Sequence, residues 1–260
     1  MSTQITTEMI KELRDATGVS VMQCKKALEE ADGNMEKALM VLKKKSSEIA
    51  AKKADRAASD GLIVVKKEGN NAVMVVLNCE TDFVAKNADF QTLAQALAEK
   101  AFTDGAETTR TAAKDMIDPV IQKIGENIVL GDVLSFSGPV IGSYVHNGKS
   151  GVVTVLTAGT EELARDIAMH IAAMKPEYLS KNDVPAEKIA MARELFEKEV
   201  ASIDKPQEIK DKMLQGKLDT YFKEQTLLEQ PYIKNPEVTV GALLAKAGAE
   251  LTSFTRKAIM

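Results

Sequence analysis

Few residues in this sequence could supply nucleophilic, acid–base or metal-binding chemistry. It contains two histidines, His146 and His170, and two cysteines, Cys24 and Cys79, which lie far apart along the chain. None of them belongs to an HExxH, CxxC or GxSxG motif, and no GxxxxGK(S/T) motif is present. A structural zinc site would need about four clustered Cys or His ligands. The sequence therefore predicts no catalytic residue, no metal site and no cofactor, and favours a protein that acts by contacting another macromolecule.

One short segment, Asn78–Asn87 (NCETDFVAKN), places an acid beside an aromatic residue where a strand is expected to end and a helix to begin. Thr81 can cap this helix, which leaves Asp82 and Phe83 side by side in its first turn. Side chains at such junctions project from rigid supports. An exposed Phe beside an Asp would suit the groove of a partner protein. In the alternative interpretation, Asp82 only complements the helix dipole and Phe83 packs inward.

Composition narrows the class of protein that carries this segment. The chain has 260 residues, which predicts about two domains, and 34 basic against 38 acidic residues give a net charge of −4. This charge and an aromatic content of 4% argue against direct binding of nucleic acid. No apolar run reaches the ~18 residues of a membrane span, and the amino terminus does not resemble a signal peptide. We therefore expect a soluble, cytoplasmic protein with reduced cysteines and no nucleic-acid or membrane partner.

The first 45 residues predict three short helices. Gly18 supplies a left-handed exit from the first helix, Ser20 and Gln23 form a capping box at the start of the second, and Asn34 caps the third. Three helices of this length enclose only a small core, so residues 1–45 are interpreted as a satellite module.

A charged linker and a change of periodicity follow the module. Residues 46–60 are rich in Lys, Ala and Ser and are interpreted as a helical tether. Its lysines could bind an anionic partner, although a solvated helix face is the simpler interpretation. The period then changes to two: residues 62–67 and 72–78 predict a β-hairpin, helical segments follow, and residues 127–137 predict a third strand.

An internal repeat defines the rest of the chain. GNNAVMVVLNCETDFVAK, residues 69–86, aligns without a gap on GKSGVVTVLTAGTEELAR, residues 148–165. A predicted strand at 141–146 precedes the second copy, and residues 249–256 predict a closing strand. The identical pairs are Gly69/Gly148, Val73/Val152, Val76/Val155, Leu77/Leu156, Thr81/Thr160 and Ala85/Ala164.

The repeat predicts an α+β fold with two related subdomains, residues 61–140 and 141–260. Each would have a small antiparallel sheet covered by helices on one side. Pro185 and Pro206 each open a segment with apolar residues at three- and four-residue spacing. These segments predict a projecting helical hairpin at about residues 185–226.

The two copies differ at the position of the aromatic residue. The second copy has Glu161 and Glu162 where the first has Asp82 and Phe83, so it keeps the acid at the helix start but not the aromatic ring. The architecture of the repeat therefore does not require Phe83, which favours its use at an interface.

The whole chain resembles the bacterial elongation factor Ts family, the guanine nucleotide exchange factors of elongation factor Tu. TDFVAKN and MQCKKAL are the most specific matches. The resemblance rests, in the family's order, on LRDATGVSVMQCKKALEEADGNMEKAL, NCETDFVAKN, GDVLSFSG, GSYVHNGKSGV, AMHIAAMKPEYL and LLEQPYIKNPEVTVGALL.

The resemblance implies a function without enzymatic catalysis. In the family, the segment that corresponds to Thr81, Asp82, Phe83 and Val84 dislocates the nucleotide-bound magnesium of the partner GTPase, elongation factor Tu. Asp82 and Phe83 would enter a groove of that GTPase and promote the release of GDP, so that GTP can bind again. The resemblance also allows a higher-order complex with the GTPase.

The resemblance implies further contacts outside this segment. It makes the amino-terminal module ubiquitin-associated-like and assigns Arg14, Val21 and Met22 to contact with the nucleotide-binding domain of the GTPase. Val21 stands where the family often has methionine. His146 matches a contact residue of the second subdomain, although a histidine in a hairpin turn would otherwise be interpreted only as exposed. His170 is expected to be structural or partly buried.

Two other classes of function remain open from the residues alone. A helical module attached to an α+β body could be a general interaction adaptor, whose complex would not respond to GTP or GDP. A small-molecule enzyme would need a concave site with converging titratable groups, which thermal shifts with ligands should reveal.

Overall fold

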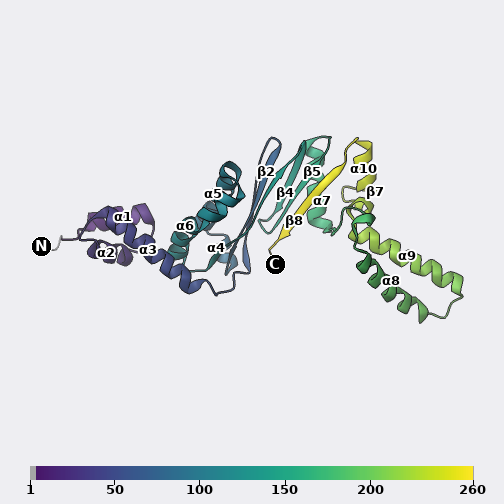
Figure 1. Ribbon diagram of the computed structural model, residues 1–260, viewed down its shortest axis with the longest axis horizontal. Coiled ribbons are helices and arrows are strands. Elements are labelled where there is room, and N and C mark those ends of the chain that lie inside the picture. Colours follow the sequence, from purple (N-terminus) through teal and green to yellow (C-terminus); the bar gives the residue numbers. More distant parts are fainter. Residues whose placement is uncertain (1–3, 260) are drawn as a thin grey trace.

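The computed structural model describes residues 4–259, which form an elongated molecule (Figure 1). A three-helix module lies at the amino-terminal end, two small sheets with their helices lie in the middle, and a helical hairpin projects at the opposite end. No helix in the described range has both the length and the apolar composition needed to cross a membrane.

The amino-terminal module forms as its capping residues predict. Its helices are α1 (Thr7–Thr17), α2 (Val21–Glu30) and α3 (Met35–Lys53). Gly18 leaves α1 with φ 69°, Ser20 and Gln23 form the predicted capping box, and Asn34 caps α3. The module core contains the buried side chains of Leu13, Val19, Cys24, Ala27, Leu28, Ala31, Ala38 and Leu42.

Residues 46–53 of the expected linker are helical, as predicted, but they are not a free tether, because they continue α3 and pack against α6 (Ala106–Ile124). Ser47 Oγ donates to Asp118 Oδ2 at 2.6 Å, and Lys53 Nζ donates to the Gly125 carbonyl at 2.5 Å. Ala50 is buried in the core of the first subdomain. The small side chains of this part of α3 allow close approach, so the module is held against the body by a continuous helix.

Two three-stranded antiparallel sheets form the body. Their strand orders, β1-β2-β3 and β4-β5-β8, are related as the repeat predicts. The strands are β1 (Asp60–Glu68), β2 (Asn71–Cys79), β3 (Ile128–Ser137), β4 (Val140–His146), β5 (Ser150–Leu156) and β8 (Leu251–Ala258). The helices packed on them are α4 (Asp82–Ala85), α5 (Ala88–Asp104), α6 and α7 (Glu161–Met174).

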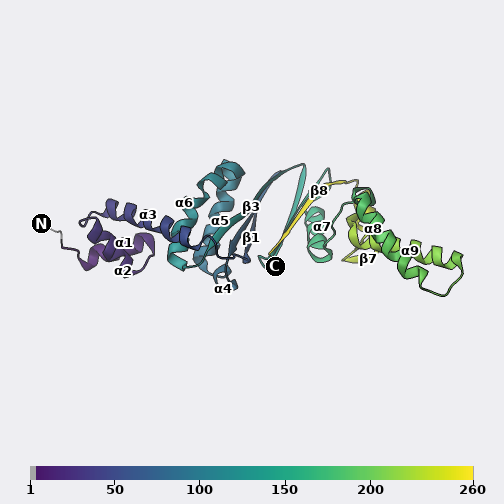
Figure 2. The ribbon, with the colours of Figure 1, turned by 60° about the horizontal axis from the view of Figure 1, so that its bottom comes forward.

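Helices cover only the outer face of each sheet, and the inner faces pack against each other. Figure 2 shows α5 and α6 outside the first sheet and α7 outside the second. Between the sheets, Ile63 and Met74 of the first meet Ile141 and Val153 of the second in one buried cluster. The Ile63 amide also donates to the Gly148 carbonyl at 2.7 Å. The predicted α+β class is confirmed.

Helix α6 contains threonines in its first two turns, although threonine is not a strong helix former. It starts at Ala106 after Gly105, which has φ 89°. Thr109 Oγ1 donates to the Gly105 carbonyl at 2.9 Å, and Thr111 Oγ1 donates to the Glu107 carbonyl at 3.1 Å. These bonds to carbonyls four residues back satisfy the threonine hydroxyls within the helix.

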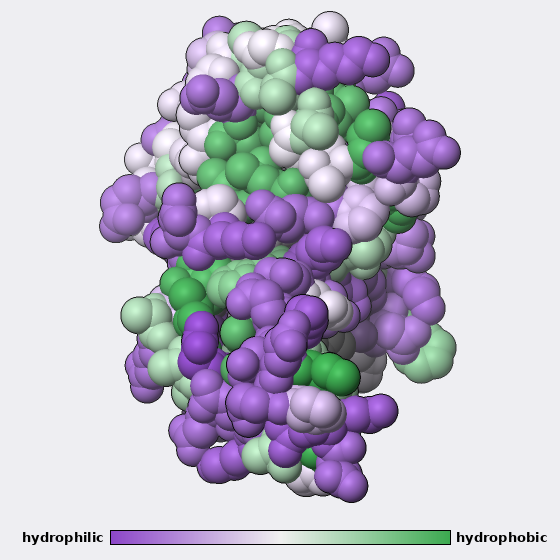
Figure 3. Space-filling view, turned by 90° about the vertical axis from the view of Figure 1, so that its right-hand side faces the viewer, coloured by the Kyte–Doolittle hydropathy of each residue, from purple (hydrophilic) through white to green (hydrophobic). Residues whose placement is uncertain are grey.

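The predicted hairpin consists of α8 (Ala186–Ala201) and α9 (Gln207–Gln225), which pack along each other. Phe196 and Tyr221 meet edge to face between them, with ring centroids 6.4 Å apart. Figure 3 views this end of the molecule, where the surface is mainly hydrophilic with smaller hydrophobic areas. The remaining elements, near the base of the hairpin, are β6 (Pro231–Tyr232), β7 (Asn235–Thr239) and α10 (Val240–Lys246).

Candidate functional site

The segment Glu80–Asn87, which we call the α4 turn, connects β2 to α5 through a helix of only four residues. Thr81 Oγ1 accepts a hydrogen bond from the Val84 amide at 3.4 Å and so caps α4. Lys86 is the C-cap of this helix, and Asn87 caps the next one, because its Oδ1 accepts from the Asp89 amide at 2.9 Å. Two caps within seven residues give the turn a defined shape.

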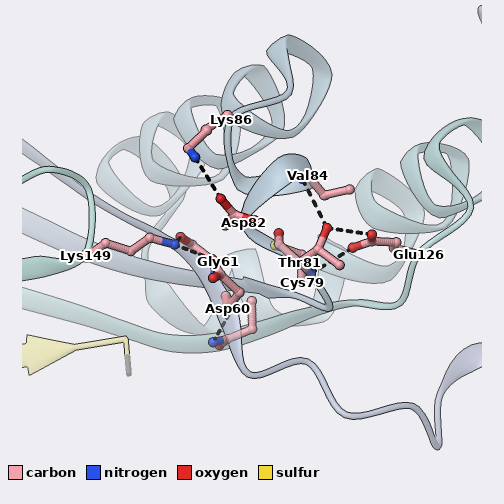
Figure 4. Close-up of polar contacts among 10 residues, drawn as sticks. Asp60, Gly61, Cys79, Thr81, Asp82, Val84, Lys86, Glu126 and Lys149 are labelled. Atoms are coloured by element: carbon pink, nitrogen blue, oxygen red, sulfur yellow. Dashed lines mark hydrogen bonds and ion pairs between the residues drawn. The ribbon is translucent and has the colours of Figure 1, made fainter.

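A carboxylate from a distant loop also holds the α4 turn. The Thr81 amide donates to Glu126 Oε2 at 3.0 Å, and Thr81 Oγ1 donates to Glu126 Oε1 at 2.7 Å (Figure 4). In the reverse direction, Glu80 Oε1 accepts from the Asn127 amide at 2.6 Å. The loop between α6 and β3 and the α4 turn are therefore joined on both sides.

Cys79 supports the turn as a hydrogen-bond donor. Its thiol is buried and donates to the Thr81 carbonyl, with Sγ and oxygen 3.2 Å apart. Burial, with the negative charges of Asp60 and Glu126, raises the pKa of this thiol to about 11. Cys79 thus remains protonated at neutral pH and has a structural role.

The α4 turn presents Phe83 to solvent. This side chain is 80% exposed, whereas the next residue, Val84, is 7% exposed and packs in the core of the first subdomain. The alternative in which Phe83 packs inward is therefore wrong. Asp82 beside it forms an ion pair with Lys86, with Oδ2 and Nζ 2.7 Å apart, which raises the pKa of the Lys86 ammonium. The turn offers an acid and an exposed aromatic ring, as the sequence predicts.

Two residues that the resemblance assigns to the contact segment have different positions. Val84 faces the core, since successive residues of a helical turn point in different directions, and its side chain anchors the turn. Thr81 is half-buried, and its hydroxyl is engaged by Val84 and Glu126. In the free protein these two side chains support the turn, and their part in a contact with the partner remains a prediction.

The residues predicted on the helical module are exposed. Val21 and Met22 begin α2 and are 51% and 62% exposed, and Arg14 is exposed in the last turn of α1. The junction between α1 and α2 lies against α6, because a Cβ at Gly18 would come within 2.9 Å of Lys123 Cε. The structure thus presents two apolar side chains at a helix start whose backbone is fixed by a capping box.

The module and the α4 turn are connected through charged side chains. Lys123 Nζ of α6 donates to Asp89 Oδ1 at 2.6 Å, and Asp89 lies in the first turn of α5, directly after the α4 turn. Lys123 therefore lies against Gly18 of the module and also bonds to Asp89 beside the α4 turn, so it connects the two predicted contact regions.

His146 is exposed at the hairpin between β4 and β5. Its Nδ1 lies 3.0 Å from Tyr144 Oη, and its Nε2 lies 3.4 Å from Asn147 Nδ2. Asn147 and Gly148 have φ of 50° and 69°, and the Lys149 amide donates to the His146 carbonyl at 2.9 Å. These are the features of a type I′ turn, which fixes the position of His146.

The hairpin that carries His146 is fastened beside the base of the α4 turn. Lys149 Nζ donates to the Gly61 carbonyl at 2.8 Å and pairs with Asp60, whose strand position faces Cys79 (Figure 4). Burial alone would raise the pKa of Asp60, but the bonds from Lys149 and the Gly61 amide outweigh it and lower that pKa. Asp60 is therefore ionised at neutral pH and joins the two subdomains at this edge.

His170 has a structural role, as expected. It is completely buried in α7, where Nδ1 accepts from the Ile233 amide at 3.2 Å and Nε2 lies 2.9 Å from Gln230 Oε1. Burial lowers the pKa of the imidazole, so the ring is neutral at pH 7.

Charged side chains also line a cavity of about 610 Å³ between β4 and α7. Four of these side chains form two ion pairs: Lys67 lies 2.7 Å from Glu161, and Lys234 lies 2.6 Å from Asp166. Among residues 4–259, no group of three or more His, Cys, Asp or Glu side chains is arranged to hold a metal ion.

Sequence reasoning missed the residues that hold the exposed side chains. Glu126, Asn127, Asp60 and Lys149 gave no local signal, because each acts on a segment far away in the sequence. The position of Glu126 directly after Gly125, a left-handed exit from α6, is the one feature that marks this loop as defined.

Comparisons with known proteins show which family this chain is similar to. The Elongation factor TS family model matches residues 80–259, and the UBA-like domain model matches residues 4–45. Elongation factor Ts of Saccharophagus degradans is 44% identical over 261 residues, which cover 97% of this chain and 90% of the relative. Elongation factor Ts of Aeromonas salmonicida is 43% identical over 262 residues, which cover 97% and 89%. The chain therefore belongs to the elongation factor Ts family.

Proposed function

We propose that this protein is a guanine nucleotide exchange factor that binds GDP-bound elongation factor Tu and promotes release of the nucleotide. The observation that supports this most strongly is the 80% exposure of Phe83 on a turn fixed by two caps and a carboxylate, in a chain of this family. An exposed aromatic ring on a rigid support suits insertion into an apolar groove, because little freedom is lost on binding.

In this proposal, the α4 turn acts as a wedge. Phe83 enters an apolar groove of the GTPase, and the Asp82 carboxylate follows it next to the residues that hold the nucleotide-bound magnesium. Magnesium bridges the phosphate oxygens, so displacing the side chains that hold it weakens the binding of GDP. No bond is made or broken in this step, and the protein needs no catalytic acid, base or nucleophile of its own.

The energetics of the proposal are those of linkage. The factor and GDP must weaken each other's binding to the GTPase by the same ratio, and each tenfold ratio corresponds to ~1.4 kcal/mol. A large contact area must supply this free energy. We propose that the exposed side chains of Arg14, Val21, Met22 and His146 provide further contacts, held in place relative to Phe83 by the α3–α6 contact and the Asp60–Lys149 pair.

Stopped-flow release of a fluorescent GDP analogue from elongation factor Tu tests the proposal. With magnesium present, the full chain should accelerate release; after chelation of magnesium with EDTA, the relative acceleration should shrink. An unchanged acceleration would contradict the magnesium step. No acceleration, together with a complex that is insensitive to GDP and GTP, would instead support a general interaction adaptor.

A further inference from the structure

We infer that Glu126 is a positioning residue for Phe83: its carboxylate holds the α4 turn in the conformation that presents the ring. The geometry of the turn supports this inference, and its expected effect on GDP release rests on the proposed exchange function. Glu126 lies in the loop between α6 and β3 and binds Thr81 through both oxygens, at 3.0 Å from the amide nitrogen and 2.7 Å from the hydroxyl.

The bond to the hydroxyl also determines how Thr81 caps α4. A threonine hydroxyl has one hydrogen to donate and lone pairs that accept. Because that hydrogen is directed to Glu126, the lone pairs are free to accept from the Val84 amide. Bonds to an ionised carboxylate are stronger than neutral ones, so Glu126 fixes both the backbone and the cap of the turn.

The second copy of the repeat shows that this carboxylate is an addition to the common fold. Thr160 caps α7 in the same way, with Oγ1 accepting from the Leu163 amide at 3.1 Å. Within residues 4–259, no side chain bonds to the Thr160 amide or receives its hydroxyl hydrogen. The cap alone is sufficient to start a helix of 14 residues, whereas α4 has only four residues and little stability of its own.

Glu126 is itself held in position. The neighbouring Asn127 is buried; its amide donates to Glu80 Oε1 at 2.6 Å, and its Nδ2 donates to the Arg56 carbonyl at 2.8 Å. The loop that carries Glu126 is therefore fixed from two directions. The fixed carboxylate of Glu126 therefore stabilises the short helix α4 and holds Phe83 in its exposed position before any partner binds.

Preorganisation predicts a specific kinetic signature. If only a fraction of molecules presents Phe83 correctly, the apparent affinity falls in proportion to that fraction, while the docked complex is unchanged. Glu126→Ala should therefore raise the factor concentration needed for half-maximal GDP release by about tenfold and leave the maximal rate within about twofold. Glu126→Gln retains one acceptor oxygen and should restore most of the affinity.

The experiment compares the full-length wild type with Glu126→Ala, Glu126→Gln, Phe83→Ala and the double variant of Phe83 and Glu126 to Ala. Glu107→Ala, which removes an exposed carboxylate of α6, is the matched control. GDP release is measured against factor concentration, and hydrogen exchange is measured for residues 80–86 of the free protein.

The inference expects faster hydrogen exchange in the α4 turn of Glu126→Ala, recovery in Glu126→Gln, and a double variant that behaves like Phe83→Ala alone. Wild-type protection and half-saturation in Glu126→Ala would overturn it, as would a double variant whose defects multiply. If the wild type itself does not accelerate GDP release, the proposed function fails, and the hydrogen-exchange comparison still decides whether Glu126 holds the turn.

Discussion

The β2–α4 and β5–α7 junctions are two versions of one structure. Both have a threonine, Thr81 or Thr160, at the N-cap of the helix. In both, the threonine side chain accepts a hydrogen bond from the amide three residues later. Ala85 and Ala164 are buried in both. The first version then ends after four residues, whereas the second continues as a single helix to Met174.

Comparing the two junctions distinguishes the residues that the fold requires from the residues that are only exposed on its surface. The identical residues lie in the cores, at the caps or, for Gly69 and Gly148, in hairpin turns with positive φ, whereas the exchanged pair, Phe83 and Glu162, lies on the surface. Glutamate is an ordinary residue for a first helical turn, but an exposed phenylalanine has no structural benefit there. The second copy therefore serves as an internal control for the function of the first.

The largest expected effect is that of Phe83→Ala. Burying a phenylalanine in an apolar groove is worth roughly 1.5–3 kcal/mol, so exchange should fall about ten- to a hundredfold. The thermal midpoint of the free protein should hardly change, since exposed substitutions usually alter stability by less than about 0.5 kcal/mol.

The matched substitution at the equivalent position is Glu162→Ala, which should leave the exchange rate unchanged. A large loss of thermal stability in Phe83→Ala, with normal exchange once folded, would show that Phe83 is a structural residue. Equal losses of exchange in both variants would remove the distinction between the two copies.

A smaller effect is expected from the helical module. Met22→Ala should weaken binding to the GTPase by roughly three- to tenfold, because part of an exposed apolar side chain would no longer be buried on association. Titration calorimetry measures this affinity directly. Met40→Ala, another exposed methionine of the same module, is the control, and equal losses in the two variants would argue against a contact centred on α2.

Substituting the two capping threonines distinguishes stability from function. Thr81→Ala and Thr160→Ala each remove one cap and should each cost about 1 kcal/mol, a shift of about 2–4 °C in the thermal midpoint. Only Thr81→Ala should also reduce exchange, by roughly threefold to tenfold, because it also loses a bond to Glu126. Comparable exchange defects in both variants would indicate a general loss of structure.

The smallest effect concerns pH. Burial lowers the pKa of His170 in the folded protein, whereas the unfolded chain has a value near ~6.5. Below that pH the unfolded state binds the proton more readily, so the contribution of His170 to stability is present above pH ~6.5 and is lost as the pH falls. Thermal midpoints of the wild type and His170→Gln should be measured from pH 7.5 to pH 5 in steps of about half a pH unit. The midpoint of the variant should depend less on pH than that of the wild type.

The local features of this fold could be predicted from sequence because their signals lie within a few residues. The capping box of Ser20 and Gln23, the left-handed Gly18 and the β1–β2 hairpin all depend on positions close together in the sequence. The exposure of Phe83 could be inferred as well, since the second copy supplied a comparison within the same chain.

The features that could not be predicted depend on contacts between distant segments. The packing of α3 on α6 uses small or polar residues such as Ser47 and Ala50, which carry no strong apolar pattern. The bond of Glu126 to Thr81 spans 45 positions, and no periodicity signals it. Val84 was placed in the contact segment by the family resemblance alone, and its burial could not be recognised from spacing, because a single helical turn is too short to show which side is buried.

Reciprocity of binding tests the account most directly. The dissociation constant of the full chain for elongation factor Tu should be measured with the GTPase free of nucleotide and again saturated with GDP. Linkage requires the factor to bind the GDP-bound form more weakly, by the same ratio by which it weakens the binding of GDP. Equal dissociation constants for the two forms would contradict the exchange function and leave the chain a binding protein that does not act on the nucleotide.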